Sequence, residues 1–211
     1  PALFCYHVSF VAFTMISSTI IAVIGLLAVS LGVPHDYPFV IEKGSKLYIE
    51  GTSNVNSFEC MCTDEFDPLT AKITLSDDDR AVTFTGTTLR LKTTLLDCDN
   101  SKMNRDLCEA LKSDDYPYIR IDLHDAVVTE GSFDDPNGAK ISCNASITIT
   151  NIARKVTLNV KGRKLSHGRF RFISTKELLM TDFGVEPPTA LLGLIKVRNA
   201  IRINFDLITK A

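Results

Sequence analysis

The cysteines are the residues of this chain whose types and spacing could most readily support chemistry. Five of them follow residue 36, and they are Cys60, Cys62, Cys98, Cys108 and Cys143. Cys60 and Cys62 stand two positions apart, so both side chains would point to the same face of a strand. A structural zinc site requires a second pair of ligands at a similar spacing, and none accompanies these two. A disulfide, a metal site and unpaired buried thiols are therefore three open alternatives.

The histidines do not form a recognisable catalytic pattern. His7 and His35 lie in or beside an uncharged N-terminal stretch. His124 falls on the polar side of an alternating segment, and His167 lies in a turn. The chain contains no Gly-x-Ser-x-Gly, no phosphate-binding loop and no His-Glu-x-x-His. The Asp-Phe-Gly at 182–184 occurs without the other kinase motifs and predicts a turn. We expect no catalysis, no cofactor and no metal.

The overall composition is that of an ordinary globular protein. Hydrophobic residues make up 45% of the chain and charged residues 23%, with a net charge of -2. Nucleic-acid binding usually requires a clustered basic face, which this balance does not indicate. We therefore expect no nucleic-acid partner.

The N-terminal stretch has a different composition from the rest. No Asp, Glu, Lys or Arg occurs in residues 1–35, which include Cys5. A bilayer-spanning helix needs about 20 apolar residues, and small residues near the end of this stretch are typical of a signal peptide. We expect residues 1–35 to be a signal peptide or a membrane anchor, with Met15 as a candidate for the true start. Cleavage and retention are both open, but either one predicts export.

Beyond residue 36 the sequence alternates between apolar and polar residues almost throughout. This period of two predicts strands with one dry face and one wet face. It is clearest in 69–75, 119–123, 141–149, 156–160 and 201–207. In the longer segment 80–96 the apolar parity switches around Gly86, which predicts a bulge or bend there.

A single segment has helical spacing. Met103, Leu107 and Leu111 would share one face of a helix that Ser101 could cap and Pro117 would end. The helix would be inserted among eight or nine strands. An antiparallel sheet of that size, dry on one face, removes its edges by closing into a barrel or sandwich. A barrel of about eight strands holds either packed side chains or one small ligand.

Four segments in order resemble the YceI-like family of exported bacterial proteins. They are "LYIEGTSNVNSFEC", "MNRDLCEALKSDDYPYIRI", "ASITITNIARKVTLNVKG" and "MTDFGVEPPTALLGLIKVRNAIRINFDL". The resemblance implies an all-β fold over residues 45–210, a single antiparallel eight-stranded lipocalin-like barrel with one inserted helix. It also implies that an isoprenoid lipid or a quinone tail binds in the lumen. A periplasmic protein, or one anchored so that it faces the periplasm, is the matching location.

The dry faces of the strands supply the candidate lumen residues. These are Phe84, Leu91, Ile121, Leu123, Ile147, Leu158, Phe170, Phe172, Leu191, Leu194, Ile203 and Phe205. The alternative is that these side chains simply fill the barrel. Candidates for a polar mouth are Asn104, Arg105, Arg169 and Arg171.

The segment "EPPTALLGLIKV" before the last strand has two interpretations. Pro187 and Pro188 would stiffen its start. The apolar residues that follow would then lie over the lumen or its rim as a flap, and they are Leu191, Leu192, Leu194 and Ile195. The alternative is a loop that plugs the barrel end.

The cysteines can now be placed in the expected barrel. An exported barrel would gain stability from a disulfide between Cys98 and either Cys60 or Cys62, which pins the helix-bearing loop to a strand. Such a bond closes a loop of about 36–38 residues and contributes a few kcal/mol. Cys143 shares its parity with Ile141 and Ile147 and is predicted to lie in the core.

The predicted function is non-enzymatic binding, transport or storage of an apolar chain lipid in the barrel. Isoprenoid lipid or quinone would be the partner, with membrane association through residues 1–35. Two alternatives are open. One is a ligand-free structural or interaction module of the cell envelope. The other is a redox or metal protein that uses Cys60, Cys62, Cys98 and Cys108.

Overall fold

The computed structural model describes residues 35–210 except 65, 67, 77–79 and 191. The predictions for residues 1–34, including Met15, and for Leu191 lie outside the described residues. Within the described part of the chain, no helix combines the length and the apolar character that crossing a membrane requires.

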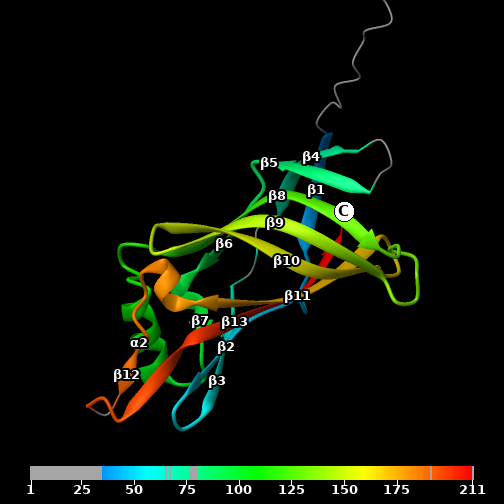
Figure 1. Cartoon of the computed structure of the whole chain (residues 1–211). Coiled ribbons are helices and arrows are strands. Elements are labelled where there is room, and N and C mark those ends of the chain that lie inside the picture. The colour runs from blue at the N-terminus through cyan, green and yellow to red at the C-terminus, as the bar shows by residue number, and fades with distance from the viewer. Residues whose placement is uncertain (1–34, 65, 67, 77–79, 191, 211) are drawn as a thin grey trace, which may run out of the picture. The chain divides into compact units, whose positions relative to one another are not determined.

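Thirteen strands, one α-helix and two short 3₁₀ helices make up the described fold (Figure 1). The first half contains β1 His35–Ile41, β2 Lys46–Ser53, β3 Ser57–Cys62, β4 Leu69–Leu75, β5 Ala81–Thr85, β6 Thr88–Lys92, η1 Thr93–Leu95, β7 Leu96–Asp97 and α2 Ser101–Ala110. The second half contains β8 Tyr118–Glu130, β9 Ala139–Ile149, β10 Ile152–Lys164, β11 Arg169–Leu179, η2 Met180–Phe183, β12 Thr189–Ala190 and β13 Ile195–Lys210.

Eight of these strands close into a ring, as the sequence predicted. The order is β1-β4-β5-β8-β9-β10-β11-β13, and β1 returns to β13 through the pairs Val40–Lys210 and Ile41–Thr209. Every pairing is antiparallel. The predicted lipocalin-like barrel with one helix is therefore confirmed. Closure leaves the eight ring strands without a free edge, which is the reason for this architecture.

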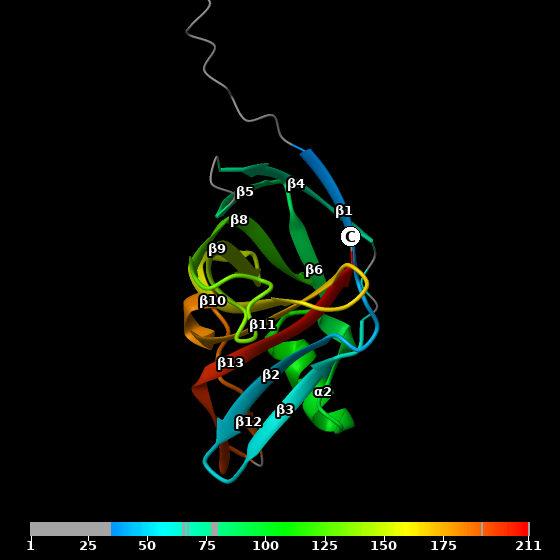
Figure 2. The same ribbon diagram turned by 90° about the vertical axis from the view of Figure 1, so that its right-hand side faces the viewer.

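The remaining five strands extend the barrel at one end. β2, β3 and β7 continue outward from β13, β6 pairs with β8, and β12 pairs with β13. Figures 1 and 2 show this end with α2, whereas β1, β4 and β5 lie at the opposite end. Sequence alone predicted eight or nine strands. β7 and β12 have two residues each, which is too few to show a period of two.

β1 lies before residue 45, where the sequence analysis placed the start of the barrel. Its residues 35–39 pair with β4, so the ring includes residues on the N-terminal side of that boundary. This strand contains Pro38, which cannot donate to a ladder and is typical of edges. Its weak alternation explains why the sequence pattern did not reveal it.

Two local predictions can be compared with the structure. Gly86 separates β5 from β6 with a φ of 68°, and both strands pair with β8, so the predicted bend occurs there. The helix cap differs from the prediction. Asn100, not Ser101, is the N-cap, and its Oδ1 accepts hydrogen bonds from the N–H groups of Lys102 and Met103 at 3.0 Å each. Asparagine and serine are comparable N-cap residues, so the sequence alone did not distinguish these two adjacent positions.

The interior of the barrel is filled by aliphatic side chains. Ile121, Ile147, Leu158 and Phe205 belong to one buried cluster with the inward-facing residues of β2, β9 and β13. Cys143 also lies in this cluster, and burial raises the pKa of its thiol to about 11. The predicted core role of Cys143 agrees with this position.

Candidate functional site

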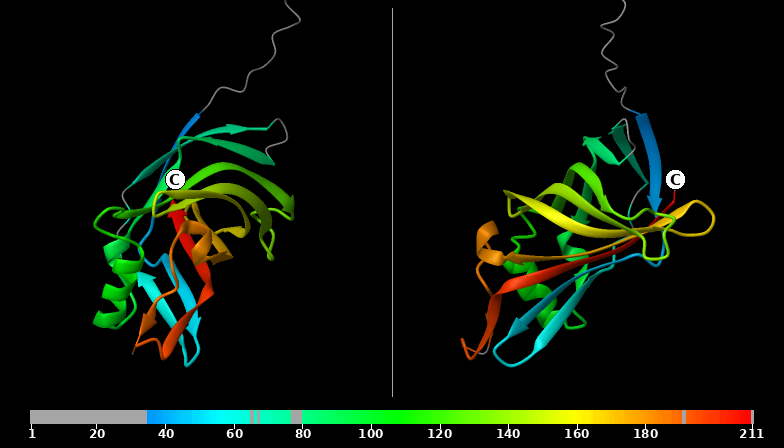
Figure 3. Two further views of the ribbon diagram at one scale, coloured as in Figure 1. Left: turned by 60° about the vertical axis from the view of Figure 1, so that its left-hand side comes forward. Right: turned by 45° about the vertical axis from the view of Figure 1, so that its right-hand side comes forward.

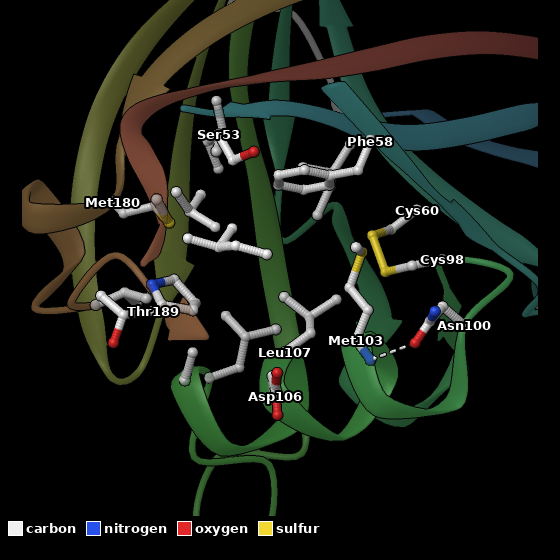
Figure 4. A pocket seen from close by; sticks show the side chains of 18 of the residues that line it. Ser53, Phe58, Cys60, Cys98, Asn100, Met103, Asp106, Leu107, Met180 and Thr189 are labelled. Atoms are coloured by element: carbon white, nitrogen blue, oxygen red, sulfur yellow. Dashed lines mark hydrogen bonds between the residues drawn. A yellow bond between two sulfur atoms is a disulfide. The ribbon is translucent and has the colours of Figure 1, made fainter. Parts of the chain in front are cut away.

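A cavity of about 390 Å³ lies at the end of the barrel where α2 packs (Figure 4). Its walls come from α2, from the sheet formed by β2, β3 and β13, and from the segment that links η2 to β12. Figure 3 shows these elements together at one end of the molecule. The lining is almost wholly apolar, and it is assembled from segments that are far apart in the sequence.

The helix wall follows from the spacing of apolar residues in α2. Met103, Leu107, Ala110 and Leu111 recur at intervals of a helical turn and all line the cavity. Figure 4 shows Met103 and Leu107 pointing inward from the helix. The Asn100 cap fixes where the helix begins, so it also fixes which face α2 turns to the cavity.

The sheet wall is formed where β2 and β3 extend beyond the ring. Ile49, Phe58 and Ile203 line the cavity from three neighbouring strands. Gly51 is paired with Phe58, and a Cβ on Gly51 would lie 2.2 Å from the Phe58 ring. Glycine at 51 therefore allows the aromatic ring to lie across the strand and face the cavity.

The third wall comes from η2 and the segment that follows it. Met180, Phe183 and Val185 line the cavity, and Phe183 is among the largest fully buried side chains. Gly184 turns the chain with a φ of 67°, so the predicted turn at Asp-Phe-Gly occurs as η2 and its cap. The Phe183 carbonyl accepts a hydrogen bond from the Thr150 hydroxyl, which attaches this segment to the β9–β10 turn.

The segment 186–197 forms a hairpin beside the cavity. β12 pairs with the start of β13 through Thr189–Lys196 and Ala190–Ile195. Pro188, Thr189 and Ile195 line the cavity. Of the flap residues that the sequence predicted, Ile195 lines the cavity, whereas Leu192 and Leu194 are exposed and do not.

The polar residues that line the cavity are mostly exposed or half-buried, and Ser53 is buried. Lys102 and Asp106 of α2 form an ion pair of 2.8 Å there, and the Asp106 side chain appears at the edge in Figure 4. Ser53 and Asn56 contribute from the β2–β3 turn, where the Ser53 hydroxyl donates to Asn56 Oδ1 at 2.8 Å. A ligand in the cavity would therefore meet apolar side chains inside and polar groups at the opening.

A disulfide joins the sheet wall to the helix. Cys60 of β3 is bonded to Cys98, which lies two residues before the Asn100 cap, and both cysteines line the cavity. This is one of the two pairings that the sequence left open. Cys62, Cys108 and Cys143 are free, and burial raises the pKa of the Cys62 thiol. Within the described residues, no group of three His, Cys, Asp or Glu side chains is placed to hold a metal ion.

The predicted lumen residues occupy several different places. Of the candidates that the structure describes, Ile203 alone lines the cavity. The core members are buried, and they are Leu91, Ile121, Ile147, Leu158 and Phe205. Phe84 and Leu123 are half-buried, and Leu191 lies outside the described residues. The period of two showed which side chains face inward, but not which part of the interior is hollow.

Phe170 and Phe172 face inward far from the cavity. With Phe133 they form an aromatic cluster, in which Phe133 contacts Phe170 edge-on at 5.5 Å and Phe172 at 6.2 Å between ring centroids. Phe172 is paired with Leu207, which lies about 13 Å along β13 beyond Ile203. These half-buried rings pack against one another near the β10–β11 turn.

The predicted mouth residues lie away from the rim. Asn104 bonds the backbone N–H of Cys98 through its Oδ1 and therefore supports the helix start. Arg169 pairs with Glu42 and Arg171 with Asp206, both near the far end of β13. Arg105 is an exposed residue of α2. Sequence reasoning missed the actual lining from α2, although the apolar stripe of the helix was a signal that could have found it.

Comparisons with known proteins identify the fold. No protein-family model matches the chain, and no curated protein matches it. BcnA from Burkholderia cenocepacia superposes with a TM-score of 0.59 at 16% identity, covering 80% of this chain and 98% of its own. A polyisoprenoid binding domain from Saccharophagus degradans, implicated in plant cell wall breakdown, has a TM-score of 0.59 at 12% identity, covering 82% and 98%. The YceI protein of Campylobacter jejuni has a TM-score of 0.47 at 14% identity, covering 68% and 81%. The two similarities with a TM-score of 0.59 show that the chain shares the fold of BcnA and of the Saccharophagus degradans domain, in agreement with the fold that the sequence resemblance implied.

Proposed function

We propose that this protein binds the apolar chain of an isoprenoid-type lipid or quinone in the cavity beside α2, and carries or stores it without catalysis. The observation that carries the proposal is the cavity itself. It is bounded by a helix, a sheet and a hairpin, and its inner lining is apolar. Apolar surface removed from water contributes about 25 cal/mol per Å², so such a ligand can bind without a charged contact.

The size of the cavity limits what it holds. A volume of about 390 Å³ is near the lower end of the roughly 300–1,000 Å³ of ligand pockets. It suits one segment of a chain lipid, with the polar end of the molecule at the rim formed by Lys102, Asp106 and Asn56. The name of the similar domain from Saccharophagus degradans, polyisoprenoid binding, supports the same class of ligand.

We also propose that the protein is exported, to the periplasm or anchored facing it. The Cys60–Cys98 disulfide supports this location, because such bonds persist in oxidising compartments. The uncharged stretch 1–35 supports it as well. The disulfide takes two of the four cysteines that a metal site would need, so it disfavours the metal alternative.

Native mass spectrometry on protein purified from its own host, followed by lipid extraction, tests the proposal directly. A co-purifying isoprenoid or quinone is the expected result. Protein without ligand, which also fails to bind added farnesol, would instead support a structural module of the envelope. Bound zinc would support the cysteine-based alternative.

A cavity-filling substitution tests the location of the ligand. Ala110→Phe places a ring in the cavity from α2, and we expect at least a tenfold loss of affinity for farnesol with little change in stability. Ala153→Phe adds the same ring at an exposed position of β10 and serves as the matched control. Titration calorimetry gives both affinities. Equal affinities in the two variants would place the ligand elsewhere.

A further inference from the structure

Three apolar side chains at the cavity rim are unusually exposed. Leu192 is 107% exposed, Leu194 74% and Val55 63%, whereas the other exposed large hydrophobic residues of the described chain reach at most 47%. Leu192 and Leu194 lie in the turn between β12 and β13, and Val55 lies in the turn between β2 and β3. We call these three residues the rim tips.

The two turns are held together by hydrogen bonds. The Asn54 side chain donates to the Leu194 carbonyl at 2.9 Å and accepts from the Lys196 N–H at 2.8 Å. The Asn54 backbone N–H also donates to the Lys196 carbonyl at 3.1 Å. The rim tips therefore project side by side from one fixed structure. Val55 itself lines the cavity, and so does Ile195, the first residue of β13 and the neighbour of Leu194. The rim tips therefore lie beside the cavity.

Leu192 conflicts with the local chemistry of its turn. Its φ is 58°, and the following Gly193 has a φ of 87°. Asparagine or glycine is preferred where φ is positive, and Asn-Gly is the usual pair in such hairpin turns. Leucine here costs backbone strain and also exposes its whole side chain to water. No contact within the described fold offsets either cost, which indicates that the Leu192 side chain has a partner outside the fold.

The shape and charge of the rim tips favour a bilayer over a protein partner. A stable protein interface takes about 800 Å² from each partner, which three aliphatic side chains on convex turns cannot supply. A lipid surface accepts small apolar projections when basic residues flank them. Lys196 and Arg198 are exposed, and no acidic residue occurs within 51–58 or 187–198, although the exposed Glu59 and Glu186 lie directly beyond these segments.

We propose that the rim tips insert into a lipid surface, with Lys196 and Arg198 facing the headgroups, so that the cavity opens onto the bilayer. The role of this contact, the loading or unloading of an apolar chain, rests on the proposed function. The contact itself does not require a ligand in the cavity.

The absence of tryptophan from the chain allows a position-specific test. Leu192→Trp in the full chain places a single tryptophan at the rim tips. With vesicles of phosphatidylcholine and phosphatidylglycerol, we expect a blue shift of its emission and quenching by brominated lipid. Val127→Trp, at an exposed position of β8, is the control and should show neither. Because each signal comes from one position, membrane binding by another part of the chain does not produce the difference.

The following fluorescence results would contradict insertion of the rim tips into a lipid surface. Emission that stays water-like at Leu192→Trp, or quenching that is equal at both positions, shows that the rim tips do not insert. A blue shift without vesicles that grows with protein concentration shows that a second copy covers them. Vesicles without phosphatidylglycerol should give weaker insertion. If the signal is the same with and without this anionic lipid, Lys196 and Arg198 do not contribute to the contact.

A second variant separates this inference from the proposed function. Leu192→Asn with Leu194→Asn suits the turn and should fold normally. We expect unchanged affinity for farnesol in solution and at least tenfold slower transfer of farnesol from vesicles. If this variant binds farnesol and also takes it up from vesicles at the normal rate, the rim tips have no role in transfer, and the proposed function is unaffected. A blue shift and lipid quenching in Leu192→Trp, without any farnesol binding by the protein, would refute the function alone.

Discussion

At the scale of single residues, the strongest polar pair lies on the outer face of the sheet. Arg171 Nε donates to Asp206 Oδ1 at 2.6 Å, and Nη2 donates to Oδ2 at 2.5 Å. This two-bond contact holds the pKa of the Asp206 carboxyl below its usual value. The pair joins β11 to β13, the two strands that extend from the barrel to the cavity. Its side chains are about one-third and one-quarter exposed, so its contribution to stability is modest.

We expect Asp206→Asn to lower the free energy of unfolding by about 1 kcal/mol or less at pH 7. A carboxyl with a lowered pKa stabilises the fold above its unfolded pKa of about 3.9, and this contribution is lost as the pH falls through the folded value. The difference between wild type and variant should therefore shrink at pH 3. Urea unfolding at both pH values measures it, with the exposed Asp114→Asn as control. A difference that grows at pH 3 would contradict this assignment.

At the scale of elements, the placement of α2 depends on what holds its start. The Cys60–Cys98 disulfide fixes the chain just before the helix, and Asn100 caps its first turn. The Asn104 side chain accepts a hydrogen bond from the backbone N–H of Cys98. Together they attach α2 to β3 on the opposite side of the cavity. The disulfide therefore has two consequences, one for global stability and one for the shape of the cavity.

Removal of the disulfide by Cys60→Ser with Cys98→Ser should lower the free energy of unfolding by about 4 kcal/mol, since it frees a loop with a sequence separation of 38. It should also weaken farnesol binding, because α2 is less firmly placed. Cys62→Ser removes a free thiol from the same strand and should have a much smaller effect on both. Denaturant unfolding and calorimetry measure these changes. If Cys62→Ser matched the double variant, Cys62 would be the true partner of Cys98, and non-reducing peptide mapping would show that link.

At the scale of the whole molecule, the barrel is filled along most of its length and hollow at one end. Phe133, Phe170 and Phe172 form a half-buried cluster near the β10–β11 turn, and the buried Phe205 lies along β13 between the partner of Phe172, Leu207, and the cavity residue Ile203. The ligand would therefore enter and leave at the α2 end.

This division predicts that stability and binding can be changed separately. Phe172→Ala should cost about 2 kcal/mol or more, since truncation of a packed aromatic ring leaves a cavity, but farnesol affinity should be unchanged. Phe58→Ala removes a ring from the cavity wall and should reduce affinity at least tenfold. Thermal unfolding and calorimetry on the two variants provide the comparison. Equal losses of affinity would mean that the two ends communicate through the interior.

The sequence by itself determined the facing of the strands, the single helix and the closed barrel. Alternation in segments such as 141–149 is a local property, because neighbouring side chains must point to opposite faces of a strand. The bend at Gly86 and the turn at 182–184 were likewise readable, since glycine marks positions of positive φ.

Only the tertiary structure decided where the barrel is hollow. Ile203 and Phe205 have the same parity and look alike in the sequence, yet one lines the cavity and the other is packed in the core. The difference comes from β3, α2 and η2, which are brought to one end by pairings between distant parts of the chain. A local pattern carries no information about neighbours that are distant in the sequence. The cavity lies between β3, α2 and η2, so only the tertiary structure reveals it.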